Sequence, residues 1–230
     1  MPAPSTSQRL KQPLTFRGIL EVLGLLAVCA VLAAVAWRFA ARKLVESRVR
    51  ADLPKVAAAI RTQRQSLLKA IDAYHQTFGH YPPDHLLSTN PPVVDVVTNP
   101  LLYELAGTFY DSTNRTFNST TLAPLKTPDL EAVFQRERFV NAAASPAQVK
   151  CFYPPTGRWV LAMREDPDIS VLGFAPMPNE LNPEYFNEVD FSGWRYASTR
   201  PEHNPGKFDL WIEVKALGRT LTFGNWKEAE

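Results

Sequence analysis

The first 80 residues place the strongest constraint on what this chain can fold into. A polar lead, residues 1–18, precedes an apolar run from Ile19 to Trp37 that contains one charged residue, Glu21. As a helix, these 19 residues span about 28 Å, close to the roughly 30 Å thickness of a bilayer core. The order of the segments predicts a transmembrane helix over residues 19–37, with a costly acid near its start.

A second helical pattern follows the apolar run, over residues 38–79. Its apolar residues recur every three or four positions and form one stripe on one helix face, which predicts an amphipathic stem. The stripe consists of Leu53, Val56, Ile60, Leu67, Ile71, Tyr74 and Phe78, and Gln63 stands where one further member would be. Pro54 predicts a kink or a helix start, and Gly79 predicts the helix end. The stripe needs a cover, either from the rest of this chain or from neighbouring chains.

The charges are divided unevenly along the chain. Residues 1–79 contain 12 Lys and Arg against 4 Asp and Glu, and residues 80–230 contain 13 against 19. Basic residues beside an apolar span typically face lipid headgroups, so the bilayer is an expected partner. These basic residues lack the interleaved aromatic residues of a nucleic-acid platform, so a nucleic-acid partner is not expected. Cys29 lies in the apolar run and Cys151 far outside it, which predicts no disulfide.

Three other interpretations of the apolar run stay open. The basic lead, with Ala34-Val35-Ala36 as a cleavage site, is compatible with a secretory signal peptide. Leu26–Cys29 loosely matches a lipoprotein signal, although Val28 is bulky for the position before the cysteine. The third interpretation is a plain anchor without a role in assembly. The basic residues at 38–55 would by themselves favour a cytoplasmic location for the C-terminal part.

Residues 80–230 are numerous enough to form one globular domain with its own core. Asn99–Gly107 predicts a short helix, with Asn as cap, Pro at the first position and Gly at the end. A second helix is predicted from Thr127 to about Val140, with acids in its first turn. Between the two helices, Asp111–Lys126 is rich in Ser, Thr and Asn, which predicts a loop or hairpin.

Strand patterns fill most of the remaining sequence. Strands are predicted at Arg158–Met163 and Gly193–Ala197, and a hairpin is predicted from Phe208–Lys215 and Arg219–Phe223. Within the hairpin, Phe208, Leu210, Ile212 and Val214 alternate with Asp209, Trp211, Glu213 and Lys215, which indicates one buried face. We therefore predict an α+β fold, in which a long N-terminal transmembrane and amphipathic helix packs on a small antiparallel sheet.

Residues at both ends of the chain resemble a known family. Ala73–Pro82 contains an aromatic residue, Gly, Tyr and Pro in succession, and Trp194–Tyr196, Pro205–Trp211 and Gly224–Trp226 follow near the C-terminus. The first segment is similar to the stem exit, and the others to the closing strands, of type IV pilin-like proteins. Among these proteins the chain most closely resembles the major pseudopilin of type II secretion and its relatives.

The resemblance implies a structural protein without enzymatic activity. It implies a single-pass inner-membrane protein with a pseudopilin-like head at 80–230 in the periplasm. Its partners would be other pilin-like subunits and the platform proteins of a secretion or pilus system. In the family a Glu at the fifth mature position meets the N-terminal amine of a neighbouring subunit, and Glu21 is the matching assembly candidate. Phe16 and Arg17 then occupy the junction where the family has Gly and Phe, and Gly18 lies two residues too late, so prepilin processing is not expected.

No cofactor, metal or catalytic group is expected. A tight hairpin at Lys215–Arg219 replaces the family's Asp- and Gly-rich calcium loop and offers almost none of the six to eight oxygen ligands that calcium needs. The spacing of His75, His80 and His85 does not favour a metal site, and Glu165–Asp168 is typical of a turn. The alternative function is a membrane-anchored extracytoplasmic binding module, or a degenerate enzyme, that does not polymerise.

Overall fold

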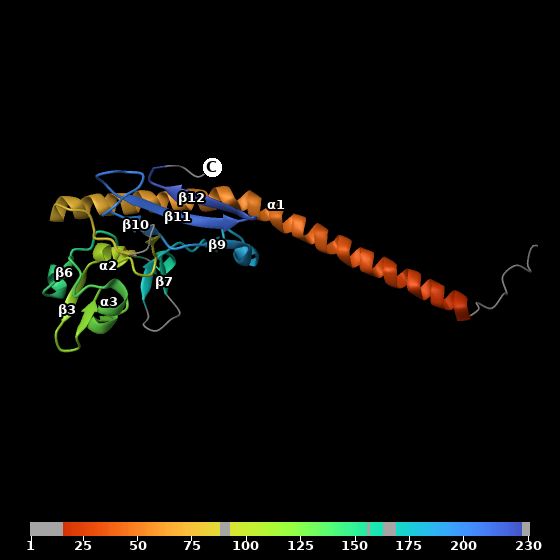
Figure 1. The fold of residues 1–230 in the computed structure, drawn as a ribbon, viewed down its shortest axis with the longest axis horizontal. Coiled ribbons are helices and arrows are strands. Elements are labelled where there is room, and N and C mark those ends of the chain that lie inside the picture. The colour runs from red at the N-terminus through yellow and green to blue at the C-terminus, as the bar shows by residue number, and fades with distance from the viewer. Residues whose placement is uncertain (1–15, 88–92, 156, 163–168, 227–230) are drawn as a thin grey trace, which may run out of the picture. The chain divides into compact units, whose positions relative to one another are not determined.

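The computed structural model describes residues 16–87, 93–155, 157–162 and 169–226 (Figure 1). Most of the polar lead and the acidic segment Glu165–Asp168 lie outside the described residues, so the turn predicted for that segment stays a prediction. The chain divides into two compact units, Met1–Arg48 and Val49–Glu230. The long helix α1, Phe16–Phe78, contributes to both units. The predicted α+β class is confirmed, because one long helix is combined with several small sheets.

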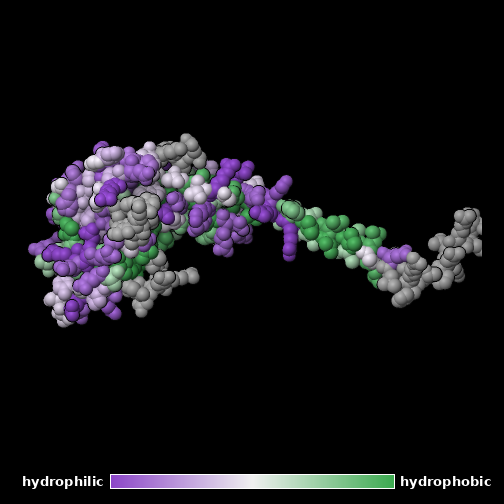
Figure 2. Space-filling view, viewed as in Figure 1, coloured by the Kyte–Doolittle hydropathy of each residue, from purple (hydrophilic) through white to green (hydrophobic). Residues whose placement is uncertain are grey.

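In the first unit, α1 is apolar on all its faces from Leu23 to Trp37. Every side chain from Leu23 to Leu44 is exposed, and the rings of Trp37 and Phe39 are 75% and 66% exposed. Figure 2 shows a continuous apolar stretch of the helix followed by a strongly hydrophilic one. The helix is long and apolar enough to cross a membrane. This agrees with the transmembrane helix predicted from the sequence.

In the second unit, α1 buries one face. Val49, Val56, Ile60, Leu67, Ile71 and Tyr74 are almost completely buried, and Leu53 and Phe78 are half-buried. The helix continues through Pro54, so this residue does not mark a helix start. A proline inside a helix costs about 3 kcal/mol. Burial of apolar side chains on both sides of Pro54 offsets that cost.

The main sheet of the second unit is antiparallel and centred on β11, Asp209–Ala216. Strand β12, Arg219–Gly224, pairs along one edge of β11, and β10, Arg195–Ala197, and β9, Val189–Phe191, pair along the other. The two turn residues Leu217 and Gly218 have φ of 53° and 73°, the geometry of a tight hairpin turn. Figure 1 shows β11 and β12 beside α1, where the Arg64 guanidinium donates to the Gly224 carbonyl.

A second sheet is mixed, and two strand pairs and several short helices complete the unit. The second sheet has the order β5 (Leu125–Lys126), β4 (Thr116–Asn118), β3 (Thr108–Asp111) and β6 (Ala142–Ala143), and β6 is parallel to β3. The strand pairs are β1 (Leu86–Leu87) with β2 (Val93–Val94), and β7 (Val160–Ala162) with β8 (Ser170–Leu172). The α-helices are α2 (Leu101–Ala106) and α3 (Thr127–Phe134), and 3₁₀ helices occupy Pro146–Gln148, Gly157–Trp159 and Pro183–Glu188.

Several predicted boundaries were wrong for local reasons. Helix α3 ends at Phe134 and not near Val140, because Gln135 takes the left-handed conformation with φ of 53° and ends the helix. The strand predicted from Arg158 starts as a 3₁₀ helix and becomes β7 only at Val160. The single predicted sheet is in fact several small sheets, because β3 and β4 pair with each other and not with β11.

Candidate functional site

The residues singled out in the sequence lie in different surroundings. Glu21 is exposed on α1 in the first unit. The stem stripe belongs to the second unit, where the C-terminal domain covers it: Val56, Ile60, Leu67, Ile71 and Tyr74 are 0–1% exposed. The cover therefore comes from this chain itself, which was one of the two possibilities that the sequence left open. Surfaces of the stem that remain for other chains lie on its polar faces.

Gln63 connects the stem to the domain by two buried hydrogen bonds. Its Nε2 donates to the Gly173 carbonyl at 2.9 Å, and its Oε1 accepts from Trp194 Nε1 at 3.0 Å. Both Gln63 and Trp194 are 2% exposed. The polar interruption of the stripe thus satisfies the indole N–H and a carbonyl that would otherwise be buried without a partner.

Glu104 is a fully buried acid on α2 that also contacts the stem. Its carboxylate accepts from Tyr74 Oη at 3.0 Å and from the backbone N–H groups of Val140 and Asn141 at 2.9 Å each. Burial raises the pKa of Glu104 above its ordinary value, although the hydrogen bonds from Asn141, Val140 and Tyr74 and the charge of Arg136 oppose that shift. Burial and the neighbouring carboxylate also raise the pKa of Tyr74.

Two further buried carboxylates order loops near the main sheet. Asp84 accepts from the backbone N–H groups of Ser198 and Thr199 at 2.6 and 2.9 Å. Asp209 accepts from the backbone N–H groups of Glu202 and His203, at 2.7 and 2.8 Å, and from Asn204. Side chains contact both carboxylates as well: the Thr199 hydroxyl donates to Asp84, and His203 Nδ1 lies 3.3 Å from Asp209 Oδ2. Because most of the donors are backbone N–H groups of the loops, the two carboxylates position these loops.

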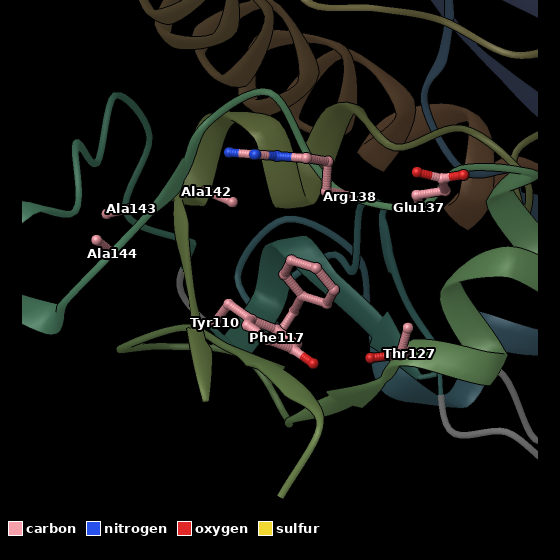
Figure 3. A pocket seen from close by; sticks show the side chains of 8 residues that line it. All are labelled: Tyr110, Phe117, Thr127, Glu137, Arg138, Ala142, Ala143 and Ala144. Carbon is pink, nitrogen blue, oxygen red and sulfur yellow. The ribbon is translucent and has the colours of Figure 1, made fainter. Parts of the chain in front are cut away.

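The second unit contains an open cavity of about 510 Å³ (Figure 3). We call it the 110–144 pocket after its lining residues: Tyr110, Phe117, Thr127, Glu137, Arg138, Ala142, Ala143 and Ala144. Figure 3 shows the rings of Tyr110 and Phe117 on one side and the guanidinium of Arg138 on the opposite side. Glu137 and Thr127 lie apart from each other on the right of the view, and Ala142–Ala144 line the left with small side chains.

Buried neighbours fix the wall of the 110–144 pocket. Phe139 follows Arg138 directly, is completely buried, and stacks on Tyr103 with ring centroids 5.1 Å apart and planes at 7°. The next two backbone N–H groups, those of Val140 and Asn141, donate hydrogen bonds to the Glu104 carboxylate. The Asn141 side chain also donates to the carbonyls of Glu104 and Lys150, at 2.8 and 2.7 Å. The pocket is therefore preformed on one side by a polar network inside the domain.

Sequence reasoning did not find this network or the pocket. The signal for Glu104 was present, because it is the only charged residue within the apolar run Leu101–Ala106. Nothing local marks the 110–144 pocket, since its residues come from β3, β4, α3, the segment leading into β6, β6 itself and the residue after it. Among the described residues, no group of three or more His, Cys, Asp or Glu side chains is arranged to hold a metal ion.

A long, N-terminally apolar helix packed onto small sheets is the architecture expected of pilin-like proteins, and this chain fits it. No family model, no curated protein and no solved structure matches the chain.

Proposed function

We propose that this chain is a structural, pilin-like subunit, anchored in the inner membrane by residues 19–37. The observation that carries the proposal is that one helix joins an apolar, exposed segment to an amphipathic segment seated on a small α+β domain. This layout supplies an anchor and a rigid stem. The buried acids Glu104, Asp84 and Asp209 hold backbone groups, which supports a structural role over a catalytic one.

The finer proposal is assembly into a fibre of the type II secretion or type IV pilus kind, with the domain in the periplasm. Its partners would be other pilin-like subunits and the platform proteins of such a system. The resemblance of the stem exit and closing strands supports this assignment. Glu21 would provide the polar contact between neighbouring helices inside the bilayer, where an acid needs a partner.

Anchoring and orientation are tested by membrane washing and a reporter fusion. We expect the full chain to stay in the membrane after carbonate treatment, with its N-terminal sequence retained before Trp37. Alkaline phosphatase fused after Glu230 should be active. A mature N-terminus at Trp37 would indicate a cleaved signal peptide, and a well-expressed but inactive fusion would place the domain in the cytoplasm.

Assembly is tested by crosslinking from an exposed face of the stem, because the stripe itself is buried. Cysteines at Gln65 and Lys69, in a chain whose Cys29 and Cys151 are replaced by serine, should crosslink between subunits. Glu21→Ala should abolish these crosslinks at an unchanged membrane level. Glu46→Ala is the matched control, since Glu46 is an acid on the same helix that pairs with Arg42 at 3.4 Å. Equal crosslinking in Glu21→Ala and the parent would remove Glu21 as an assembly residue.

A second candidate function is a membrane-anchored binding module that does not polymerise. The 110–144 pocket favours it, because a cavity of about 510 Å³ with aromatic and charged lining is within the roughly 300–1,000 Å³ range of ligand sites. Absence of crosslinks in the parent, together with binding of a ligand in this pocket, would favour this function over the fibre subunit.

A further inference from the structure

We infer that the 110–144 pocket binds a carboxylate attached to an aromatic or bulky apolar group. The carboxyl-terminal residue of a peptide and a free N-acylated aromatic amino acid share this chemistry. The inference deepens the second candidate function, and it applies equally to a chain that also polymerises. It rests on three properties of the pocket: an apolar floor, an arginine that has no hydrogen bond or ion pair among the described residues, and a wall of small residues held by buried neighbours.

The floor of the pocket consists of two aromatic rings. Tyr110 and Phe117 face each other across the β3–β4 hairpin, with ring centroids 5.0 Å apart. Phe117 is 4% exposed and serves as core, whereas Tyr110 keeps 40% of its surface exposed. Aromatic faces of this kind pack well against flat or bulky apolar groups. A ligand that covers Tyr110 would remove this exposed ring from water.

The opposite side of the pocket provides a positive charge. Among the described residues, Arg138 has no hydrogen bond or ion pair, and Figure 3 shows its guanidinium extended over the cavity toward Ala142. A guanidinium matches a carboxylate by two parallel hydrogen bonds. Glu137 lies at the Thr127 side and suits an N–H donor of the ligand, such as the amide that precedes a terminal carboxylate. The two charges thus set the direction in which the ligand lies.

Three successive alanines line one side of the cavity. Larger side chains at Ala142, Ala143 and Ala144 would fill the cavity that these methyl groups leave open. The wall is held from behind by Phe139 and by the hydrogen bonds of Val140 and Asn141 to Glu104. A site that is fixed before the ligand arrives loses little conformational entropy on binding.

The test measures binding to the full chain in lipid nanodiscs by calorimetry. The probes are N-acetylphenylalanine, its primary amide N-acetylphenylalaninamide, and the peptide Gly-Gly-Gly-Gly-Phe with a free or an amidated carboxyl end. We expect both free carboxylates to bind at least about tenfold more tightly than their amides, because the amide loses the charge-assisted hydrogen bonds to Arg138. Tighter binding of the peptide than of the free amino acid derivative would identify a peptide terminus as the preferred source, and the reverse would identify a small acid.

Three variants assign any binding to this pocket. Arg138→Ala should lose the preference for carboxylate over amide, and Ala143→Trp should lose binding of all probes by filling the cavity. Arg219→Ala, which removes an exposed arginine of β12 outside the pocket, should bind like the parent. Unchanged melting temperatures for the variants would show that the domain is intact. No binding by the parent, equal binding of acid and amide, or full binding by Arg138→Ala would overturn the inference. None of these outcomes depends on fibre assembly.

Discussion

Helix α1 has two different surroundings along its length. Between Leu23 and Leu44 its side chains are exposed on every face, and between Val49 and Phe78 one stripe is buried by the C-terminal domain while the other faces are polar. The hydrophobic pattern fits these surroundings, because apolar residues cover every face from Leu23 to Trp37 and one face from Val49 to Phe78. The difference shows that two segments of one continuous helix can be adapted to different surroundings. The first segment is suited to lipid and the second to its own domain and water.

The sharpest test of this difference is the same substitution made in both segments. Leu67 is completely buried, and Leu26 is 59% exposed. Leu67→Ala should lower the free energy of unfolding of the domain by about 2–5 kcal/mol, because it leaves a cavity in the core. Leu26→Ala should leave it unchanged. Denaturant unfolding in detergent micelles, followed by tryptophan fluorescence, measures both. Equal effects of the two substitutions would contradict separate surroundings.

A charge introduced into each segment tests the membrane. Val28 and Ala58 are both exposed on α1, in the first and second units respectively. Val28→Arg should weaken insertion by about 2.5–3.5 kcal/mol, the cost of an arginine near the centre of a span. Ala58→Arg should have no effect on insertion. The fraction extracted by carbonate measures the difference, and an unchanged extraction of Val28→Arg would argue against lipid as the surroundings of the first segment.

The next largest effect on stability is expected from the hydrogen bonds of Gln63, the polar residue within the buried stripe. Gln63→Ala leaves the Trp194 indole N–H and the Gly173 carbonyl without their partners. Each unsatisfied buried group costs about 1–3 kcal/mol, so we expect a loss of roughly 2 kcal/mol or more. Gln65→Ala, two residues along on an exposed face, is the control and should cost almost nothing. A loss for Gln63→Ala no larger than for Gln65→Ala would show that the contact does not hold the stem.

The smallest effect concerns pH and the Tyr74–Glu104 contact. Because burial raises the pKa of Glu104, the folded state holds this proton more tightly than the unfolded chain does. Its contribution to stability is therefore fullest below the unfolded pKa and decreases as pH rises through the folded pKa. Glutamine does not titrate, so the stability of the parent relative to Glu104→Gln should fall between acidic and neutral pH. Melting temperatures at pH 5 and pH 8 measure this change, with Glu137→Gln as an exposed control. A melting temperature of the parent that rises relative to that of Glu104→Gln between pH 5 and pH 8 would contradict this prediction.

The features that the sequence predicted well are those with short-range periodicity. The stripe of α1 and the hairpin of β11 and β12 both followed from spacing, because a helix and a strand repeat every few residues. Asp209 departs from the alternation: it was assigned to the polar face, yet it is 2% exposed. Its burial depends on backbone donors in the Glu202–Asn204 loop, which no periodic pattern reveals.

The features that the sequence missed depend on residues far apart in the chain. Gln63 was visible as a polar member of the stripe, but its partner Trp194 lies 131 residues away. The 110–144 pocket likewise needs the register of β3 with β6, which is a parallel pairing between separate segments. The role of Glu21 and the boundaries of the lead, span and stem stay predictions.

The sequence separation between Gln63 and Trp194 has a consequence during synthesis. The stem stripe is made early, and Trp194 and the strands beside α1 are made last. At about 5–20 residues per second, the 131 residues between Gln63 and Trp194 take roughly 7–26 s to produce. Throughout that interval Gln63 lacks its partner Trp194, and the stem lacks the cover that the main sheet later provides. That interval is far longer than a helix takes to form, so the stem helix can form well before the strands that cover it exist.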